Sequence, residues 1–274
     1  GGSSGTTNGD ASTMRLKGPS SLTILPDGVT MLVGEFDGRC VRKYDIPTGV
    51  IQDFLGLCGA GTDSVNNVFG TNARFGLVFQ TLLDPITNDD IFISDLGEHE
   101  IRKSTSAGYV TLVAGSTGSY ADNVDPTLAQ FYNPSPIVRQ VSTGDIYVGD
   151  RNNNRIRKIA GGTGEVSSAA GSGTSGNVDG TGTSARVSSS MLRAVRHPDD
   201  VSMIFGQFHR VRVFHMSTTT VYTIIGDANS AGWTSNADPM AAQVNDVGGV
   251  CFPPDYGRLY VVGENAVSYA EMQT

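Results

Sequence analysis

The sequence predicts an all-β protein, a β-propeller built from four-stranded antiparallel blades. A strand-rich unit recurs five times in the 274 residues, and its most recognisable segment is a strand that carries a basic residue pair. The arginines of this segment are Arg42, Arg102, Arg157 and Arg212, spaced by 60, 55 and 55 residues. Self-similarity at such a period is typical of propellers and solenoids. We therefore expect five blades, with six blades as the alternative.

Each unit reads as four short strands, A to D, separated by Gly, Asp and Asn turn signals. The third unit is the most regular, with strands expected at 135–142, 146–150, 155–160 and 165–171. The successive units cover approximately 13–72, 73–128, 129–184, 185–240 and 241–274. The last unit ends after strand C, so we expect its strand D to come from sequence before Gly1, which would close the ring.

A closed repeat array overrides the usual prior of about 150 residues per domain, so residues 1–274 are predicted to form a single domain. No stretch approaches the roughly 18 consecutive apolar residues of a membrane span, and no signal-like segment opens the chain. Because the first residue is Gly1 rather than Met, we expect the sequence to be part of a larger precursor whose signal or anchor lies elsewhere.

The stretch IYVGDRNNNRIRKIAGGTGEV at 146–166 resembles NHL repeats, in which an aspartate ends strand B and a basic pair lies on strand C. The fourth and fifth units depart from this pattern, since Gln207 and Glu264 replace the aspartate. The resemblance implies a platform for protein or RNA partners; a minority of related propellers are lyases and lactonases. The acidic, Ser/Thr/Gly-rich repeats look most like ectodomain NHL propellers, such as the flagellum-attachment glycoproteins of kinetoplastids.

Net charge argues against RNA binding. The formal charge is -8 and the sequence pI is near 4.9, which is the wrong sign for counterion release from a phosphate backbone. One Arg-Lys pair per blade is interpreted as a solvated strand face with snorkelling side-chain stems. An RNA-binding propeller or an intracellular scaffold remains the alternative to an extracellular module.

Catalytic residues are sparse where the inner strands begin. These segments offer only Asn133, Asn245 and Asp246 as oxygen ligands, and the four histidines are expected to be structural or surface residues. No nucleophile elbow, HExxH pair or phosphate-binding loop occurs. We predict a protein that is not an enzyme and has no metal or cofactor, with a propeller lyase or lactonase as the alternative.

An Asn-x-Asp signature follows strand D in four of the five repeats. Its members are Asn8 and Asp10, Asn123 and Asp125, Asn177 and Asp179, and Asn236 and Asp238. Such side chains hydrogen-bond the backbone two residues on and so fix a loop. Calcium binding is the other interpretation, but one carboxylate per loop is too few for six to eight oxygen ligands.

The strand order places the D–A and B–C loops on one side of the blades and only tight turns on the other. We expect a partner protein, such as a second membrane-anchored adhesion protein, to bind the loop-rich face, without nucleic acid or membrane insertion. The candidate binding residues are Phe36, Asp37, Arg39, Glu98, His99, Tyr120, Arg151, Asn153, Phe208, His209, Arg210 and Trp233. Trp233 and Tyr120 are the expected apolar anchors, because aromatic residues dominate interface energetics.

The three cysteines leave the compartment open. Cys40 begins a strand C and Cys58 follows strand D of the same blade, so a disulfide is possible if a local bulge or loose end brings them together. A regular hairpin would instead place Cys40 opposite Leu55. Cys251 is predicted to be a buried free thiol. An extracellular or cell-surface ectodomain of a membrane-anchored protein is expected, with an intracellular location as the alternative.

Overall fold

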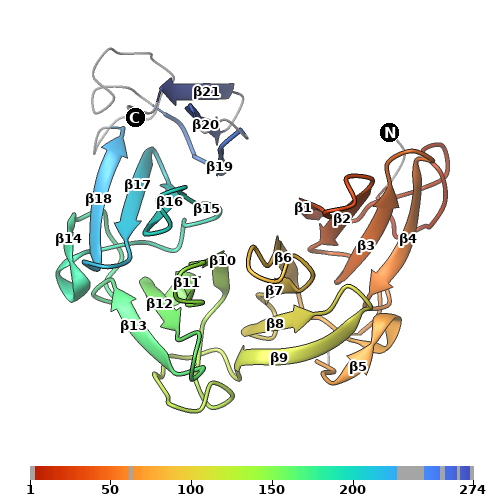
Figure 1. Cartoon of the computed structure of the whole chain (residues 1–274), viewed down its shortest axis with the longest axis horizontal. Helices are drawn as coiled ribbons and strands as arrows, with labels where there is room; N and C mark the ends of the chain where they lie inside the picture. Colours follow the sequence, from red (N-terminus) through yellow and green to blue (C-terminus); the bar gives the residue numbers. More distant parts are fainter. Residues whose placement is uncertain (1–3, 62–63, 227–243, 254–256, 264–265, 272–274) are drawn as a thin grey trace. The chain divides into compact units, whose positions relative to one another are not determined.

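The computed structural model describes every residue except 1–3, 62–63, 227–243, 254–256, 264–265 and 272–274 (Figure 1). The fold is an all-β, five-bladed propeller of small antiparallel sheets, as the repeats predict. The chain divides into two compact units, Gly1–Pro134 and Ser135–Thr274, which are described separately. Within the described ranges, no helix has the length and hydrophobicity needed to cross a membrane.

The first unit contains two blades. Blade 1 has the sheet order β1-β2-β3-β4, and its strands are β1 (Pro19–Ile24), β2 (Thr30–Glu35), β3 (Cys40–Asp45) and β4 (Val50–Leu55). Blade 2 has the order β5-β9-β8-β7-β6. Its elements are β5 (Val68–Phe69), the 3-10 turn η1 (Gly70–Asn72), β6 (Val78–Leu83), β7 (Ile91–Asp95), β8 (Glu100–Ser104) and β9 (Tyr109–Gly115).

The second unit contains the other three blades. Blade 3 consists of β10 (Pro134–Arg139), β11 (Ile146–Asp150), η2 (Arg151–Asn153), β12 (Arg155–Ile159) and β13 (Val166–Ala170). Blade 4 consists of β14 (Gly180–Thr181), η3 (Gly182–Ser184), β15 (Ala194–Arg196), β16 (Ser202–Gln207), β17 (Arg210–His215) and β18 (Thr220–Ile225). Blade 5 has three described strands, β19 (Gly249–Cys251), β20 (Arg258–Gly263) and β21 (Ala266–Glu271). Its strand D and the closure of the ring stay predictions.

A short fifth strand covers the outer edge of blades 2 and 4. β5 pairs with β9 and β14 pairs with β18, and each belongs to the loop that leads into its own blade. In blade 1 the corresponding contact is a single bridge between Gly9 and Ile51. The incoming loop therefore satisfies part of the exposed edge of strand D, where unpaired backbone groups would invite aggregation.

Each unit is held together by apolar faces that pack between its blades. In the first unit, Leu32, Val41 and Leu55 of blade 1 pack against Phe75 and Val78 of blade 2, all fully buried. In the second unit, one cluster joins blades 3 and 4 and another joins blades 4 and 5. Burying one such side chain stabilises the folded state by about 2 kcal/mol. The packed faces therefore hold neighbouring blades, and the ends of their loops, in fixed positions.

Strand D carries a bulge at the same place in blades 1 to 4, just after the partner of the buried arginine. In blade 1 the pairing shifts from Val41–Leu55 to Arg42–Asp53, which leaves Phe54 as the extra residue. The same shift occurs at Arg102, Arg157 and Arg212. A bulge bends the strand and increases its twist, and at Phe54 it shortens the path between Cys40 and the segment after β4.

Strand B needs a small residue before its last position. A side chain at Gly149 would meet the backbone oxygen of Ser135 and the ring of Pro136 at 2.6 Å, and one at Gly206 would collide with Val247. Blade 1 has Gly34 at this position, while blade 2 has Ser94, which is fully buried. The close approach of the neighbouring strand explains the glycine in IYVGD.

Candidate binding face

The D–A and B–C loops lie together on one side of the blades, as the strand order predicts. In blade 1, Phe36 N–H donates to the Gly18 carbonyl at 2.7 Å and Gly38 N–H donates to the Lys17 carbonyl at 3.0 Å. In the second unit, Val247 N–H donates to the Phe208 carbonyl at 2.7 Å. We call this side the loop-bearing face.

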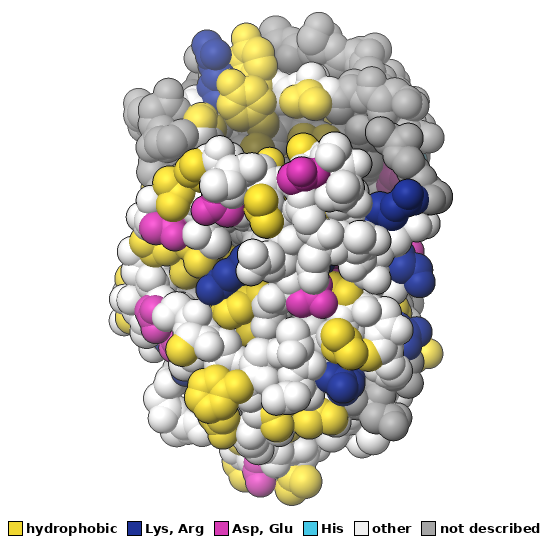
Figure 2. All heavy atoms as spheres, turned by 90° about the vertical axis from the view of Figure 1, so that its right-hand side faces the viewer, with side chains coloured by type: hydrophobic (Ala, Val, Ile, Leu, Met, Phe, Trp, Pro, Cys, Tyr) yellow, Lys and Arg dark blue, Asp and Glu magenta, His cyan; other side chains and the backbone are white. Residues whose placement is uncertain are grey.

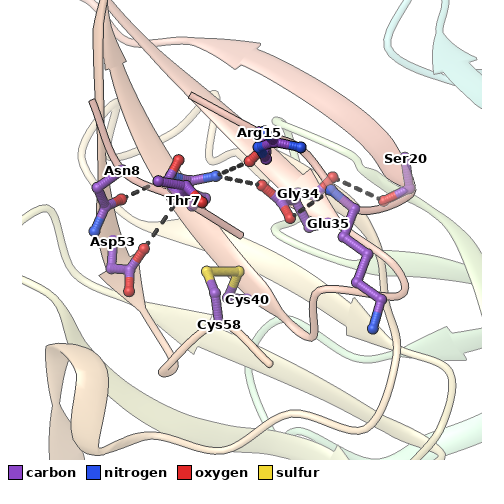
Figure 3. Close-up of a disulfide and its surroundings, with 11 residues drawn as sticks. Thr7, Asn8, Arg15, Ser20, Gly34, Glu35, Cys40, Asp53 and Cys58 are labelled. Atoms are coloured by element: carbon purple, nitrogen blue, oxygen red, sulfur yellow. Dashed lines mark hydrogen bonds and ion pairs between the residues drawn. A yellow bond between two sulfur atoms is a disulfide. The ribbon is translucent and has the colours of Figure 1, made fainter. Parts of the chain in front are cut away.

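A buried arginine organises the loops of blade 1, and Figure 3 labels its surroundings, which include Thr7, Asn8, Arg15, Glu35 and Asp53. The Arg42 guanidinium is fully buried, and one of its terminal nitrogens donates to Glu35 at 3.0 Å and to the Arg15 carbonyl at 2.7 Å. The other terminal nitrogen donates to the Thr7 carbonyl and the Asn8 side chain, both at 2.7 Å. Asp53 of β4 adds an ion pair at 3.4 Å. One side chain of strand C thus holds the incoming D–A loop.

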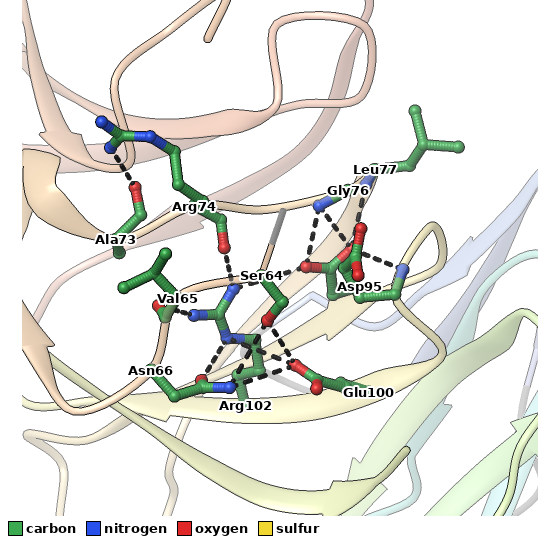
Figure 4. A network of polar contacts seen from close by, with 11 residues as sticks. Ser64, Val65, Asn66, Ala73, Arg74, Gly76, Leu77, Asp95, Glu100 and Arg102 are labelled. Carbon is green, nitrogen blue, oxygen red and sulfur yellow. Dashed lines mark hydrogen bonds and ion pairs between the residues drawn. The ribbon is translucent and has the colours of Figure 1, made fainter. Parts of the chain in front are cut away.

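Blade 2 repeats this arrangement around Arg102 (Figure 4). Arg102 donates to Asn66 Oδ1 at 2.8 Å, to Asp95 at 3.5 Å and to the carbonyls of Val65 and Arg74. The Asp95 carboxylate also accepts hydrogen bonds from the backbone of Gly76 and Leu77, at 3.0 and 2.9 Å. The aspartate at the end of strand B therefore anchors the start of strand A as well as the arginine.

Blades 3 and 4 differ in the source of the negative charge. In blade 3, Arg157 pairs with Asp150 at 2.7 Å, and both side chains are fully buried. In blade 4, Gln207 takes the place of the aspartate, and Arg212 instead pairs with Asp179 of the D–A loop at 2.9 Å. The departure from the repeat pattern at Gln207 is thus compensated by a loop carboxylate. We call these four sites, at Arg42, Arg102, Arg157 and Arg212, the arginine centres.

The interpretation of the arginines as a solvated strand face was wrong. All four are fully buried, because their multiple donors match several carbonyl and carboxylate oxygens that would otherwise be unsatisfied inside the blade. Only the neighbouring lysines behave as predicted: Lys103 and Lys158 are 36% exposed and pair with Asp90 and Asp145. Strand alternation separates the two members of each basic pair onto opposite faces.

Burial shifts the acidities of these groups. Burial raises the pKa of Glu35, although the Lys17 amide and Arg42 favour its charged form. Burial lowers the pKa of Arg102, opposed by Asp95 and Glu100. At Asp179 burial alone would raise the pKa, but hydrogen bonds from Thr223 and Arg212 outweigh it and the pKa is lowered. The charged pairs are maintained because each carboxylate and guanidinium has hydrogen-bond partners.

The Asn-x-Asp side chains fix their loops, as the structural interpretation predicts. Asp125 N–H donates to Asn123 Oδ1 at 2.9 Å, and the Asp10 carboxylate accepts from the Ser12 amide at 3.0 Å. The loop leading into blade 2 lacks the signature, and there the Asn66 side chain accepts a hydrogen bond from Arg102. Asn236 and Asp238 lie outside the described residues.

Cys40 and Cys58 form a disulfide, with their Cα atoms 5.1 Å apart (Figure 3). The bulge at Phe54 supplies the shortened path that the sequence requires. The bridge ties the start of strand C to the next D–A loop, and Gly59 N–H donates to the Gly38 carbonyl beside it at 2.8 Å. The prediction for Cys251 was wrong: this thiol is free but exposed, because it lies on the short strand β19 with its side chain turned away from the buried face.

The first unit brings several predicted binding residues to the loop-bearing face. Phe36 is partly buried against Phe79, with ring centroids 6.1 Å apart, whereas Asp37 is exposed. Arg39, Glu98 and His99 are partly buried. Tyr120 is 42% exposed and donates to Asp122 at 3.4 Å.

In the second unit the predicted residues divide. Phe208 is 44% exposed, and Asn153 donates to Asp150 at 2.9 Å. Arg151 is partly buried and donates to the Ser189 carbonyl at 2.6 Å, and burial lowers its pKa. Arg210 is only 6% exposed, so the expectation of a surface contact there is wrong. His209 is partly buried, and Trp233 lies outside the described residues.

The loop at 116–133 carries exposed apolar side chains, of which only Tyr120 was predicted from the sequence. Val124 is 76% and Leu128 is 60% exposed, and Tyr132 resembles Tyr120 at 42%. Ala121 and Gln130 form an antiparallel bridge, in which each backbone N–H donates to the other residue's carbonyl, and this bridge orders the loop. Their irregular spacing gave no periodic signal, but apolar residues within a Gly/Asp/Asn-rich loop are a signal in themselves.

Charges of both signs are interspersed on the surface of the side viewed in Figure 2, without a continuous basic patch. This agrees with the net charge of -8. Among the described residues, no group of three or more His, Cys, Asp or Glu side chains could hold a metal ion. Asn133 and Asp246, two of the three residues that the sequence offers as oxygen donors, have left-handed backbone conformations with φ of 57° and 43°.

Several solved propellers have a similar fold at low identity. A streptogramin B lyase is 15% identical with a TM-score of 0.55, over 98% of this chain and 73% of the lyase chain. A chain of the nidogen/laminin complex is 12% identical with a TM-score of 0.59, over 94% of this chain and 78% of that one. The extracellular domain of a putative hybrid two-component system from Bacteroides thetaiotaomicron is 13% identical with a TM-score of 0.57, over 94% of this chain and 34% of that one.

Sequence comparison adds a family match in the third blade. No protein with a curated description matches the chain by sequence. Residues 131–159, which include β10, β11 and β12, match the NHL repeat family. This is the segment in which the buried arginine, the aspartate of strand B and the loop asparagines most closely follow the repeat pattern. The family match covers this one repeat, and the five antiparallel sheets show the propeller fold.

Proposed function

We propose that this chain is a non-catalytic, extracellular protein-binding module that contacts its partner through the loop-bearing face. The observation that carries the proposal is the loop at 116–133, which is ordered by backbone pairing yet exposes four apolar side chains. Tyr120, Val124, Leu128 and Tyr132 provide apolar area on a preorganised loop. Preorganisation lowers the entropic cost of binding, and aromatic anchors supply most of the binding energy at protein interfaces.

The arginine centres support this proposal. In blades 1, 2 and 4 they hold the incoming D–A loop through buried, multiply bonded guanidinium groups. Loops fixed in this way lose little conformational entropy when a partner binds. One of the similar solved structures is a chain of the nidogen/laminin complex, which is consistent with a protein partner here.

The disulfide supports an extracellular location. Cys40 and Cys58 are bridged, and structural disulfides persist mainly in oxidising compartments. The Bacteroides relative is described as an extracellular domain. An ectodomain of a membrane-anchored protein is the narrower form of this proposal, and adhesion to a second surface protein is narrower still. The resemblance to flagellum-attachment glycoproteins finds no support among these relatives.

An enzyme of the lyase type is the second candidate, because one similar structure is a streptogramin B lyase. At 15% identity that likeness concerns the fold alone. Turnover of a lactone or a streptogramin by the purified protein, abolished by substitution of Asn133 or Asp246, would replace the binding proposal.

The proposed binding face is tested by screening the purified domain against secreted proteins and surface ectodomains, followed by affinity measurements on variants. Tyr120→Ala and Trp233→Ala should each weaken binding about tenfold or more, since about 1.4 kcal/mol is one decade in affinity. Ile86→Ala is the matched control, because Ile86 is 43% exposed on a tight turn of the opposite side. Asp27→Ala on another such turn should also leave affinity unchanged.

The two faces give opposite outcomes. If partner affinity survives Tyr120→Ala and Trp233→Ala but falls with Ile86→Ala, the binding face has been assigned to the wrong side. Circular dichroism of each variant confirms that the propeller remains folded.

A further inference from the structure

Two histidines occupy the same position in the repeat and make the same unusual hydrogen bond. His99 and His209 each precede the first residue of a strand C, in blades 2 and 4. The Asn133 amide donates to His99 Nδ1 at 3.2 Å, and the Asp246 amide donates to His209 Nδ1 at 3.3 Å. In both cases the donor is at the end of the following D–A loop, next to or just before the next strand A.

The geometry fixes the protonation state of both rings. An imidazole nitrogen that accepts a hydrogen bond must carry a lone pair, so the proton of the neutral ring lies on Nε2. In a protonated ring both nitrogens carry hydrogen, and Nδ1 would then face an amide N–H with a hydrogen of its own. Protonation therefore breaks this bond and creates a repulsion in its place.

The backbone held by these bonds is in a conformation that depends on support. Asn133 and Asp246 have φ of 57° and 43°, in the left-handed region that non-glycine residues seldom adopt. At each of these two positions the backbone amide thus donates to a histidine ring nitrogen. Blade 3 has Asn154 at the equivalent position, and its side-chain amide donates to the Gly173 carbonyl at 3.2 Å, a contact that no proton can break.

We propose that His99 is a pH-sensitive positioning residue, which holds the end of the D–A loop at Asn133 when neutral and releases it when protonated at mildly acidic pH.

The surroundings of His99 favour the neutral ring. The Tyr132 ring packs edge-on against the His99 ring, with centroids 5.3 Å apart. Gly118 lies beside Nε2 of His99, and a Cβ atom at position 118 would collide with the imidazole ring. Burial lowers the pKa of His99, opposed by Asp95. The other charged groups near it in sequence are Glu98 and Glu100 of its own loop and strand.

The sign follows from the lowered pKa of His99. The unfolded chain binds a proton near pH 6.5 and the folded chain only below that value. The neutral His99 ring therefore contributes its full stabilisation of the folded state above about pH 6.5, and this contribution is lost as the pH falls below that value. Arg210 and Asp246 are the charged groups adjacent to His209, of opposite sign to each other.

The experiment measures the ring state and the backbone protection in the intact domain. Nitrogen NMR of the histidine rings at pH 7.5 should show an unprotonated Nδ1 and a protonated Nε2 for His99 and His209. Amide exchange of Asn133, corrected for the intrinsic pH dependence, should accelerate more than about tenfold between pH 7.5 and 5. The amide of Ile137, in the interior of β10, is the internal reference.

Variants separate the titrating ring from a merely structural one. His99→Gln keeps an acceptor that does not titrate, so Asn133 protection should become independent of pH. His99→Phe removes the acceptor and should lose protection at every pH, whereas His215→Gln on β17 should change nothing. Protonation of His99 without faster exchange at Asn133, or a protonated Nδ1 at pH 7.5, would overturn the proposal; neither readout requires a variant to fold or a partner to be known.

Discussion

The arginine centre of blade 4 allows a direct test of charge compensation. Asp179→Ala removes the only carboxylate that pairs with Arg212 among the described contacts, at 2.9 Å, together with two hydrogen bonds to Thr223. A hydrogen bond to a charged group contributes about 1.5–3 kcal/mol. Because Asp179 is 47% exposed, solvent screening reduces the ionic part, and we expect a loss of about 2 kcal/mol in the free energy of unfolding.

Gln207→Glu should restore part of this loss. Gln207 Oε1 already accepts from Arg212 at 3.2 Å, and Glu35 provides the precedent for a glutamate at this position in blade 1. The recovery should be incomplete, since the Gln207 amide also donates to the Gly176 carbonyl at 2.9 Å and a carboxylate cannot. We expect the double variant to recover about half the loss, which is a coupling energy of about 1 kcal/mol.

Urea unfolding followed by far-UV circular dichroism measures all four proteins of this cycle. The corresponding fall in Tm for Asp179→Ala is about 5 °C. Asp125→Ala is the matched control, because Asp125 occupies the same loop position before blade 3, where Asp150 supplies the charge; its effect should be much smaller. If the free energy of unfolding lost by the double variant equals the sum of the losses of the two single variants, Asp179 does not compensate for Gln207.

Two further predictions concern covalent and alkaline stability. Replacing Cys40 and Cys58 together by serine should lower the free energy of unfolding by about 3 kcal/mol, as expected for a bridge between residues 18 apart. Adding reductant to the unsubstituted protein should lower its free energy of unfolding by the same amount. Burial, and then Asp145, raises the pKa of Tyr147 to about 12; a raised tyrosine pKa contributes stability that is present below about pH 10 and lost as pH rises toward 12. Tyr147→Phe should remove this alkaline loss, and ultraviolet absorbance of tyrosinate against pH checks the wild-type titration; a Tyr147 that ionises near pH 10 contradicts it.

Much of the fold could be predicted because its signals are local and repeated. Turn residues, β-branched strands and a constant spacing determine where strands A to D lie, and the strand order alone determines which loops share a side. The bulge at Phe54 was a condition inferred from the cysteine positions, and it is present. Cys251 shows the limit, because a three-residue strand gives too short a pattern to assign its faces.

The candidate site was harder to predict because it depends on contacts distant in sequence. Arg42 lies 27 residues from Arg15 and 35 from Thr7, the residues whose carbonyls it binds. A basic pair on a strand has the same appearance in the sequence whether its arginine faces solvent or a set of loop carbonyls. The aspartate seven residues before each arginine in blades 2 and 3 was the available signal, since a carboxylate and an arginine that recur at a fixed separation can form a pair.

The arginine centres explain how the repeat tolerates variable loops. A carbonyl oxygen is present at every residue, so a loop needs no particular side chain to bind a guanidinium; Arg42, Arg102 and Arg212 all donate to two loop carbonyls. The required residues are confined to the blade itself, and even the carboxylate can move to the loop, as Asp179 shows. Loop composition is then free to differ between blades while loop position is retained.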